Sequence, residues 1–199
     1  LNTDQRKLLG MIQKSSSAML VKVNNFLTLS RLDSGRVKVK ASVFRPLDTA
    51  RSVEALFAPL AAEKGLDLTV THSPQISGDF LADEILIKKA VGNLISNAVK
   101  FTDAGTVDLS VKTELADDGG CWLTFTVTDT GIGLVYDDLQ RLADPEMPTP
   151  GNATGLGLPI SHQIAHLLGG EIIAKSEIGG GSAFSLRLPA ERVETVTAL

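Results

Sequence analysis

Apolar or small residues recur every three or four positions between residues 9 and 30, a period that predicts an amphipathic helix with a coiled-coil-like seam. The seam consists of Leu9, Ile12, Ser16, Met19, Val23, Phe26 and Ser30. The helix is expected to end near Gly35, since glycine adopts the left-handed conformation that closes helices. Such a seam is not stable uncovered. We therefore expect it to pack either on its own domain or on a partner helix from this chain or another copy.

Strand and helix patterns alternate after residue 35. They predict strands at 36–44, 66–71, 106–114, 122–128, 171–176 and 182–188, and helices at 46–64, 81–101 and 158–168. Turn residues at 116–120 and 179–182 predict hairpins, residues 134–154 read as a long surface loop, and the last ten or so residues as a frayed tail. Adjacent strands joined by hairpins, with helices between them, predict an α/β (α+β) two-layer sandwich with a mixed or antiparallel sheet covered by helices on one face.

Composition narrows the function classes. The 199 residues, 43% of them hydrophobic, suit one compact core with a small appendage. A net charge of −4 provides no basic stripe for nucleic acid. No apolar run reaches the roughly 20 residues that span a bilayer, so no membrane segment is expected in this chain. The single cysteine, Cys121, favours a reducing compartment, and we expect the cytoplasm.

Three polar segments carry the candidate chemistry, and the first lies at the end of the predicted helix 81–101. Asn93, Asn97 and Lys100 form a stripe about 110° from the apolar one, at the edge of the core. The apolar stripe consists of Ile87, Val91, Leu94, Ala98 and Phe101. Amide oxygens suit Mg²⁺, and a lysine can meet phosphate charge. A helix with a polar edge and no ligand is the alternative.

The second segment follows the predicted strand that ends at Asp129. Strict alternation places this carboxylate on the core-facing side, with Leu123, Phe125 and Val127. A buried carboxylate needs donors, and the exocyclic amine of adenine would supply one. Alternatively, the carboxylate caps the turn that Gly131 and Gly133 make.

The third segment, Gly155-Leu156-Gly157-Leu158, directly precedes a predicted helix, whose N-terminal N–H groups could hold a phosphate. A simple turn into a helix explains it as well. His162 and His166 have a zinc-like spacing, but glutamine follows the first histidine and no third ligand is suggested, so they do not indicate a zinc site.

In this order, with residues 29–35 leading in, the three segments resemble the catalytic core of bacterial sensor histidine kinases over nearly the whole chain. Residues 93–101 match the family's asparagine box, 129–133 its first glycine box and 155–158 its second. Residues 29–35 resemble the end of the second helix of its dimerisation hairpin, and residues 169–171 and 181–184 resemble its closing hairpin.

The resemblance implies a Bergerat fold that binds ATP and Mg²⁺, with residues 1–35 as part of the dimerisation hairpin, 36–190 as the ATP-binding domain and 191–199 as a tail. Asn97 would be the Mg²⁺ ligand, Asn93 and Lys100 would face the phosphates, and Asp129 would read the adenine amine. Residues 134–154 would form a lid. The other implied nucleotide-binding residues are Phe101, Gly131, Ile132, Gly133, Thr154, Gly155, Leu156, Gly157 and Leu158.

The implied activity is transfer of the ATP γ-phosphoryl to a histidine outside this chain, and then to an aspartate on a response regulator receiver domain, by a full-length homodimer. Related ATPases such as gyrase carry a glutamate in place of Asn93. An amide cannot act as a general base, so Asn93 favours transfer over hydrolysis. The alternative is a pseudokinase or a histidine-phosphotransfer-like docking module with a relic pocket.

The chain departs from the family pattern in three ways. The phosphoacceptor histidine belongs to the hairpin's first helix, whereas His72, His162 and His166 lie in other elements. Residues 141–145 of the lid stand where the family has a phenylalanine pair. Arg141 is the only cation in that stretch, so the lid is expected to grip phosphate less well. Ala153 replaces the glycine usual before Thr154, and we expect this change to stiffen the lid's hinge.

Overall fold

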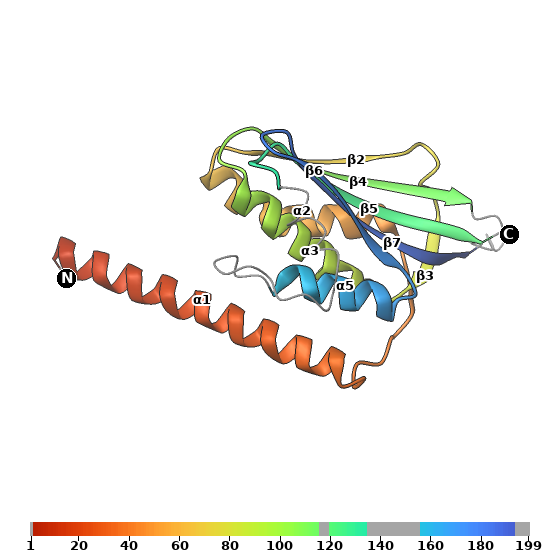
Figure 1. Cartoon of the computed structure of the whole chain (residues 1–199), viewed down its shortest axis with the longest axis horizontal. Helices are drawn as coiled ribbons and strands as arrows, with labels where there is room; N and C mark the ends of the chain where they lie inside the picture. Colours follow the sequence, from red (N-terminus) through yellow and green to blue (C-terminus); the bar gives the residue numbers. More distant parts are fainter. Residues whose placement is uncertain (1, 116–119, 135–155, 194–199) are drawn as a thin grey trace, which may run out of the picture.

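One mixed sheet is covered on one face by three helices, and a long N-terminal helix lies outside them (Figure 1). The computed structural model describes residues 2–115, 120–134 and 156–193. In chain order the elements are α1 (Thr3–Asp33), β1 (Ser42–Phe44), α2 (Pro46–Glu63), β2 (Asp67–His72), β3 (Asp79–Ala82), α3 (Glu84–Phe101), β4 (Thr106–Leu115), β5 (Cys121–Asp129), α5 (Gly157–Leu167), β6 (Glu171–Glu177) and β7 (Gly181–Val193). The predicted two-layer α/β sandwich is confirmed.

The sheet has the strand order β1-β3-β7-β5-β4-β2, with β6 also paired to β7. Only the β2–β4 pair is parallel among the described strands, and the other pairs are antiparallel. The long strand β7 pairs with β5 along one edge and with β6 and then β3 along the other. Strand β7 therefore runs from its hairpin with β6, next to the first glycine segment, to its pairing with β3 at the other end of the strand.

The hydrophobic core lies between the sheet and helices α2, α3 and α5. Leu123, Phe125 and Val127 point into it from β5, as the alternation predicted. The predicted apolar stripe of α3 is buried at Ile87, Val91, Leu94 and Ala98. Phe101 is an exception, with 38% of its surface exposed, because it is the last residue of the helix.

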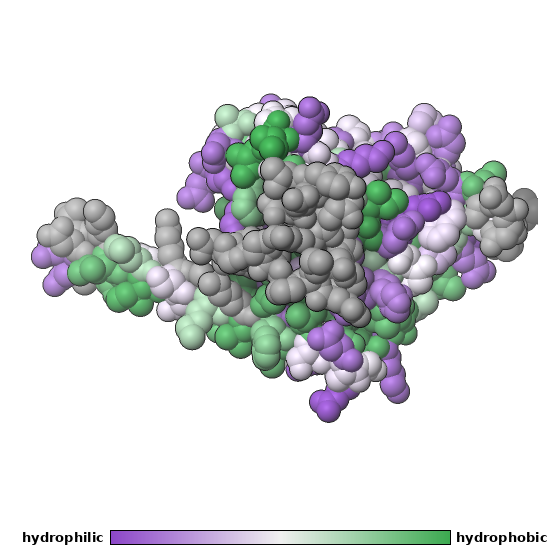
Figure 2. Space-filling model, in the orientation of Figure 1, coloured by the Kyte–Doolittle hydropathy of each residue, from purple (hydrophilic) through white to green (hydrophobic). Residues whose placement is uncertain are grey.

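Among the described residues, helix α1 packs on the domain through its last turns. Leu29 and Leu32 contact the core, and the Lys89 ammonium on α3 donates to the Thr28 hydroxyl at 2.7 Å. The N-terminal part of the helix projects beyond the domain (Figure 1), and apolar surface lies along it beside hydrophilic surface (Figure 2). The apolar seam residues Leu9, Ile12, Met19, Val23 and Phe26 are 46–69% exposed. Packing on its own domain thus accounts for one end of the seam, and most of the seam stays accessible.

Helix α1 begins before the predicted apolar pattern starts, and it ends near Gly35 as predicted. Asn2 and Gln5 form a capping box at the start of α1, and Gly35 follows its end with φ of 64°. Neither α1 nor any other helix in the described part of the chain combines the length and apolarity that a membrane span requires.

Two predicted boundaries near β3 are wrong. Only Ser42–Phe44 of the predicted strand 36–44 pairs in the sheet. Residues 81 and 82 belong to β3, so the predicted helix 81–101 begins instead at Glu84. Asp83 caps this helix, its carboxylate accepting from the Leu86 N–H at 3.0 Å. The four-residue strand β3 is too short to show a period in the sequence, and pairing with β1 and β7 holds it in place.

The end of the chain also differs from the prediction. Strand β7 continues to Val193, past the predicted strand end at 188 and the predicted domain end at 190, because residues 191–193 pair with β3. Most of the predicted loop 116–120, most of the lid 134–154 and the last six residues, 194–199, lie outside the described residues.

Candidate functional site

Helix α3 connects the described parts of all three segments. On its α5 side, the Asn93 amide donates to the carbonyl oxygen of Gly157 at 3.1 Å. The buried Ser161 hydroxyl lies 3.1 Å from the same carbonyl and 3.2 Å from the carbonyl of Ala90. These contacts fix the first turn of α5 against the middle of α3.

The C-terminal end of α3 contacts the first glycine box. The Ile132 N–H donates to the Phe101 carbonyl at 3.3 Å. A Cβ on Gly131 would lie 2.5 Å from that carbonyl oxygen and 2.9 Å from the Thr102 hydroxyl, so only glycine fits without a shift. The turn after β5 and the end of α3 are therefore held as one unit.

The β6–β7 hairpin contacts this turn from the other side. The Gly179 N–H donates to the Ile132 carbonyl at 2.9 Å, and the Leu134 N–H donates to the Ser176 hydroxyl at 2.8 Å. Gly133 has φ of 66°, and a Cβ there would collide with the carbonyl oxygen of Glu177. The predicted hairpin turn at 179–182 is confirmed, and it also supports the first glycine box, which the sequence did not indicate.

Asp129 lies between these two supports with 7% of its surface exposed, on the core-facing side as predicted. Burial raises the pKa of its carboxyl above the ordinary value, and backbone N–H groups of Gly131 and Ser182 partly offset that rise. The Gly131 N–H donates to Oδ1 at 2.9 Å, so the turn-capping role is present. A carboxylate offers about four acceptor positions, which leaves capacity for a further donor.

The polar stripe of α3 lies at the edge of the core, as the helical period predicted. Asn93 and Asn97 are half-buried and Lys100 is exposed. The Lys100 ammonium lies 4.7 Å from the centroid of the Phe101 ring. Ile132 is 60% exposed and is joined to the end of α3 through the Phe101 carbonyl, so exposed apolar surface accompanies Asp129 at this turn.

The second glycine box is described only from Leu156 onward, and Thr154 and Gly155 lie outside the described residues. Helix α5 begins at Gly157, as predicted within one residue. Leu158 is buried in the core. Nowhere in the described ranges do three or more histidine, cysteine or acidic side chains form a group that could hold a metal.

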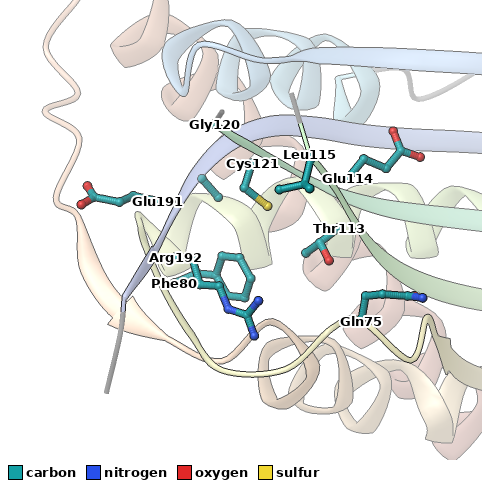
Figure 3. A pocket seen from close by; sticks show the side chains of 10 residues that line it. Gln75, Phe80, Thr113, Glu114, Leu115, Gly120, Cys121, Glu191 and Arg192 are labelled. Carbon is teal, nitrogen blue, oxygen red and sulfur yellow. The ribbon is translucent and has the colours of Figure 1, made fainter. Parts of the chain in front are cut away.

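A separate cavity of about 510 Å³ lies at the other end of the β4–β5 pair (Figure 3). Phe80, Thr113, Cys121 and Arg192 line it, and burial raises the pKa of the Cys121 thiol. Cys121 pairs with Leu115, whereas Asp129 pairs with Val107 at the opposite end of the same two strands. The cavity is therefore not part of the candidate site.

Comparisons with known proteins show the family to which the chain is related. Residues 82–192, which include the described parts of all three boxes, match the family described as histidine kinase-, DNA gyrase B- and HSP90-like ATPase. The chain is 32% identical over 200 residues to the autoinducer 2 sensor kinase/phosphatase LuxQ of Vibrio cholerae, covering 98% of this chain and 23% of that protein. It is 31% identical over 189 residues to the sensor histidine kinase RcsC of Salmonella typhimurium, covering 92% and 19%.

Among solved structures, full-length ShkA in complex with AMPPNP superposes with a TM-score of 0.82 at 29% identity, covering 98% of this chain and 41% of that one. The chain spans about a quarter or less of the length of the two curated relatives, LuxQ and RcsC. The family match over residues 82–192 covers more than half of the chain, and the two curated relatives are sensor kinases by name. The chain belongs to the histidine kinase-, DNA gyrase B- and HSP90-like ATPase family.

Proposed function

We propose that this chain is the ATP-binding catalytic domain of a two-component sensor histidine kinase and that it binds Mg-ATP across the three boxes. The observation that carries the proposal is the buried Asp129 carboxylate, which accepts from the Gly131 N–H. Gly131 packs against the end of α3, and Asn93 on the same helix donates to the start of α5. Hydrogen bonds and close packing thus connect an acceptor, a polar helix edge and a helix N-terminus.

Asp129 would accept a hydrogen bond from the exocyclic amine of adenine. Phe101 at the end of α3 and Ile132 in the turn after β5 are joined by a backbone hydrogen bond, and their exposed apolar side chains would cover the faces of a planar base. A base that donates to a buried carboxylate compensates the cost of keeping that carboxylate charged. This arrangement favours adenine, whose amine is a donor, over guanine, which presents a carbonyl at the equivalent position.

The phosphates would lie along the polar edge of α3, facing Asn93 and Lys100, with the N-terminus of α5 beside them. Asn97 would hold Mg²⁺, which neutralises phosphate charge when bound. The side chain of Asn93 is an amide and already donates to the Gly157 carbonyl, so it would orient this end of the site instead of removing a proton from water. These roles favour phosphoryl transfer to a protein acceptor.

The acceptor would be a histidine on another part of the full-length protein, and the phosphoryl group would pass from there to a response regulator aspartate in the cytoplasm. RcsC and LuxQ are sensor kinases by name. The exposed seam of α1 supports a homodimer formed through paired helices. A docking module with a relic pocket is the second candidate, motivated by the altered lid sequence at 141–145.

Calorimetric titration with Mg-ADP tests the nucleotide site. We expect the wild type to bind, and Asp129→Asn to lose about ten- to a hundredfold in affinity, the value of a hydrogen bond to a charged group. Absence of wild-type binding at millimolar ligand would contradict the proposal.

In a second experiment, this chain is mixed with labelled ATP and a separate hairpin that carries the family's histidine. Transfer of label to the hairpin supports the kinase. Nucleotide binding without transfer supports the docking module, and steady ATP turnover without any acceptor supports a hydrolysing relative.

A further inference from the structure

The side chain of Lys64, the residue that caps the end of α2, reaches the C-terminal end of α3. Its ammonium donates to three backbone carbonyls, those of Val99 at 2.8 Å, Lys100 at 3.0 Å and Thr102 at 3.0 Å. The Asp103 carboxylate lies 4.0 Å away. An ammonium has three N–H donors, so these three carbonyls can use its full donor capacity.

These bonds complete the hydrogen bonding at the end of α3. The last four carbonyls of a helix have no partner within it. Here the Ala98 carbonyl accepts from the N–H and hydroxyl of Thr102, and the Phe101 carbonyl accepts from the Ile132 N–H. With Lys64, every carbonyl from residue 98 to residue 102 has a donor. The ammonium also places a positive charge at the negative end of the helix dipole.

The same segment carries the residues proposed to meet the nucleotide. The carbonyl of Lys100 is held directly by Lys64, and the Phe101 carbonyl and Thr102 hydroxyl are the atoms against which Gly131 packs. A shift of this last turn would therefore move the Lys100 ammonium.

We propose that Lys64 is a positioning residue for the nucleotide site, which acts by fixing the backbone of Lys100 so that its ammonium meets the phosphates. This inference rests on the proposed function. It assigns a role to a side chain that lies outside the three boxes and 29 or more positions before the first of them in the sequence.

The competing explanation is a helix cap that contributes only stability, and a double-mutant cycle separates the two. Lys64→Met keeps the apolar stem and removes the donors. We expect Mg-ADP affinity to fall about tenfold in the wild-type background and by less than about twofold in the Lys100→Met background, because a positioning effect needs the group that it positions. A loss of equal size in both backgrounds would overturn the proposal.

Lys88→Met is the matched control. Lys88 lies on α3 too, but its ammonium forms a partly exposed ion pair with Glu84 at 2.9 Å. We expect Mg-ADP affinity within about twofold of the wild type for this variant. All titrations are made below the unfolding temperature of the least stable variant, as followed by circular dichroism. If Lys64→Met does not fold, Lys64→Gln, which keeps a shorter donor group, takes its place in the same cycle.

The wild-type titration separates the two levels of the proposal. A wild type that binds Mg-ADP, together with a Lys64→Met that binds equally well, overturns the role of Lys64 alone. A wild type that does not bind overturns the proposed function and this inference with it.

Discussion

The two glycine boxes use the same residue type for different physical reasons. In the first box, a Cβ on Gly131 or Gly133 would meet backbone atoms of α3 or of the β6–β7 hairpin at distances that real side chains do not adopt. In the second box, a Cβ on Gly157 would meet only the Asn93 side chain among the described residues, at an ordinary 3.7 Å. The fold itself requires glycine in the first box. At Gly157 the described structure does not, and we propose that close approach of the nucleotide is the reason for this glycine.

The largest expected effect is that of Gly133→Ala. Its φ of 66° is unfavourable for alanine, and the new methyl would collide with the Glu177 carbonyl. We expect the free energy of unfolding to fall by about 3 kcal/mol. Chemical denaturation measures it, and a loss below about 0.5 kcal/mol would break the comparison, because the first box would then tolerate a side chain.

Asp129→Asn tests the carboxylate that the first box supports. The pKa of Asp129 is raised in the folded state because burial disfavours its charged form. Adenine recognition needs the ionised acceptor, so Mg-ADP affinity should fall as the pH drops through this raised pKa. In Asp129→Asn the affinity should be about ten- to a hundredfold lower at neutral pH and should lose that pH dependence.

Stability should follow pH in the opposite sense. The folded state holds the Asp129 proton more tightly than the unfolded state, so this residue's contribution to stability decreases as pH rises from the unfolded carboxyl pKa through the raised folded pKa. Denaturation of the ligand-free protein at neutral pH should therefore show Asp129→Asn at least as stable as the wild type. A clear loss of stability would mean that capping the turn is the main role of this carboxylate.

Gly157→Ala should separate affinity from stability. Gly157 is not among the glycines with positive φ, and alanine is favourable in a helix. We expect an unfolding free energy within about 0.5 kcal/mol of the wild type, together with about a tenfold loss of Mg-ADP affinity. Unchanged affinity would remove the ligand as the reason for this glycine.

The smallest effect is expected for Gly179→Ala. Gly179 has φ of 73°, but no described atom lies within 4 Å of a Cβ built there. The change therefore carries the conformational cost without a collision, about 1 kcal/mol in unfolding free energy. Mg-ADP affinity should stay within about twofold, and a larger change would show that the hairpin's conformation reaches the site.

Sequence patterns were informative where the period decides the direction of a side chain. The period of two placed Asp129 on the buried face of β5, and the period of 3.6 placed Asn93 and Asn97 at the edge of the core. Those periods do not report contacts between distant segments. Lys64 and the carbonyl of Val99 are 35 positions apart, and strand β3 depends on neighbours from both ends of the chain. The support of the site was therefore less predictable than its chemistry.

Helix α1 has a mechanical consequence for the site. Its 31 residues correspond to a rod of about 46 Å, whose described contacts with the domain lie near its C-terminal end. The Lys89–Thr28 bond joins that end to α3. Lys89 lies one helical turn before Asn93, so the side chains of Lys89 and Asn93 lie on the same face of α3. A displacement of the N-terminal part of α1 would therefore be passed to α5, on which α1 packs, and through the Lys89–Thr28 bond to α3.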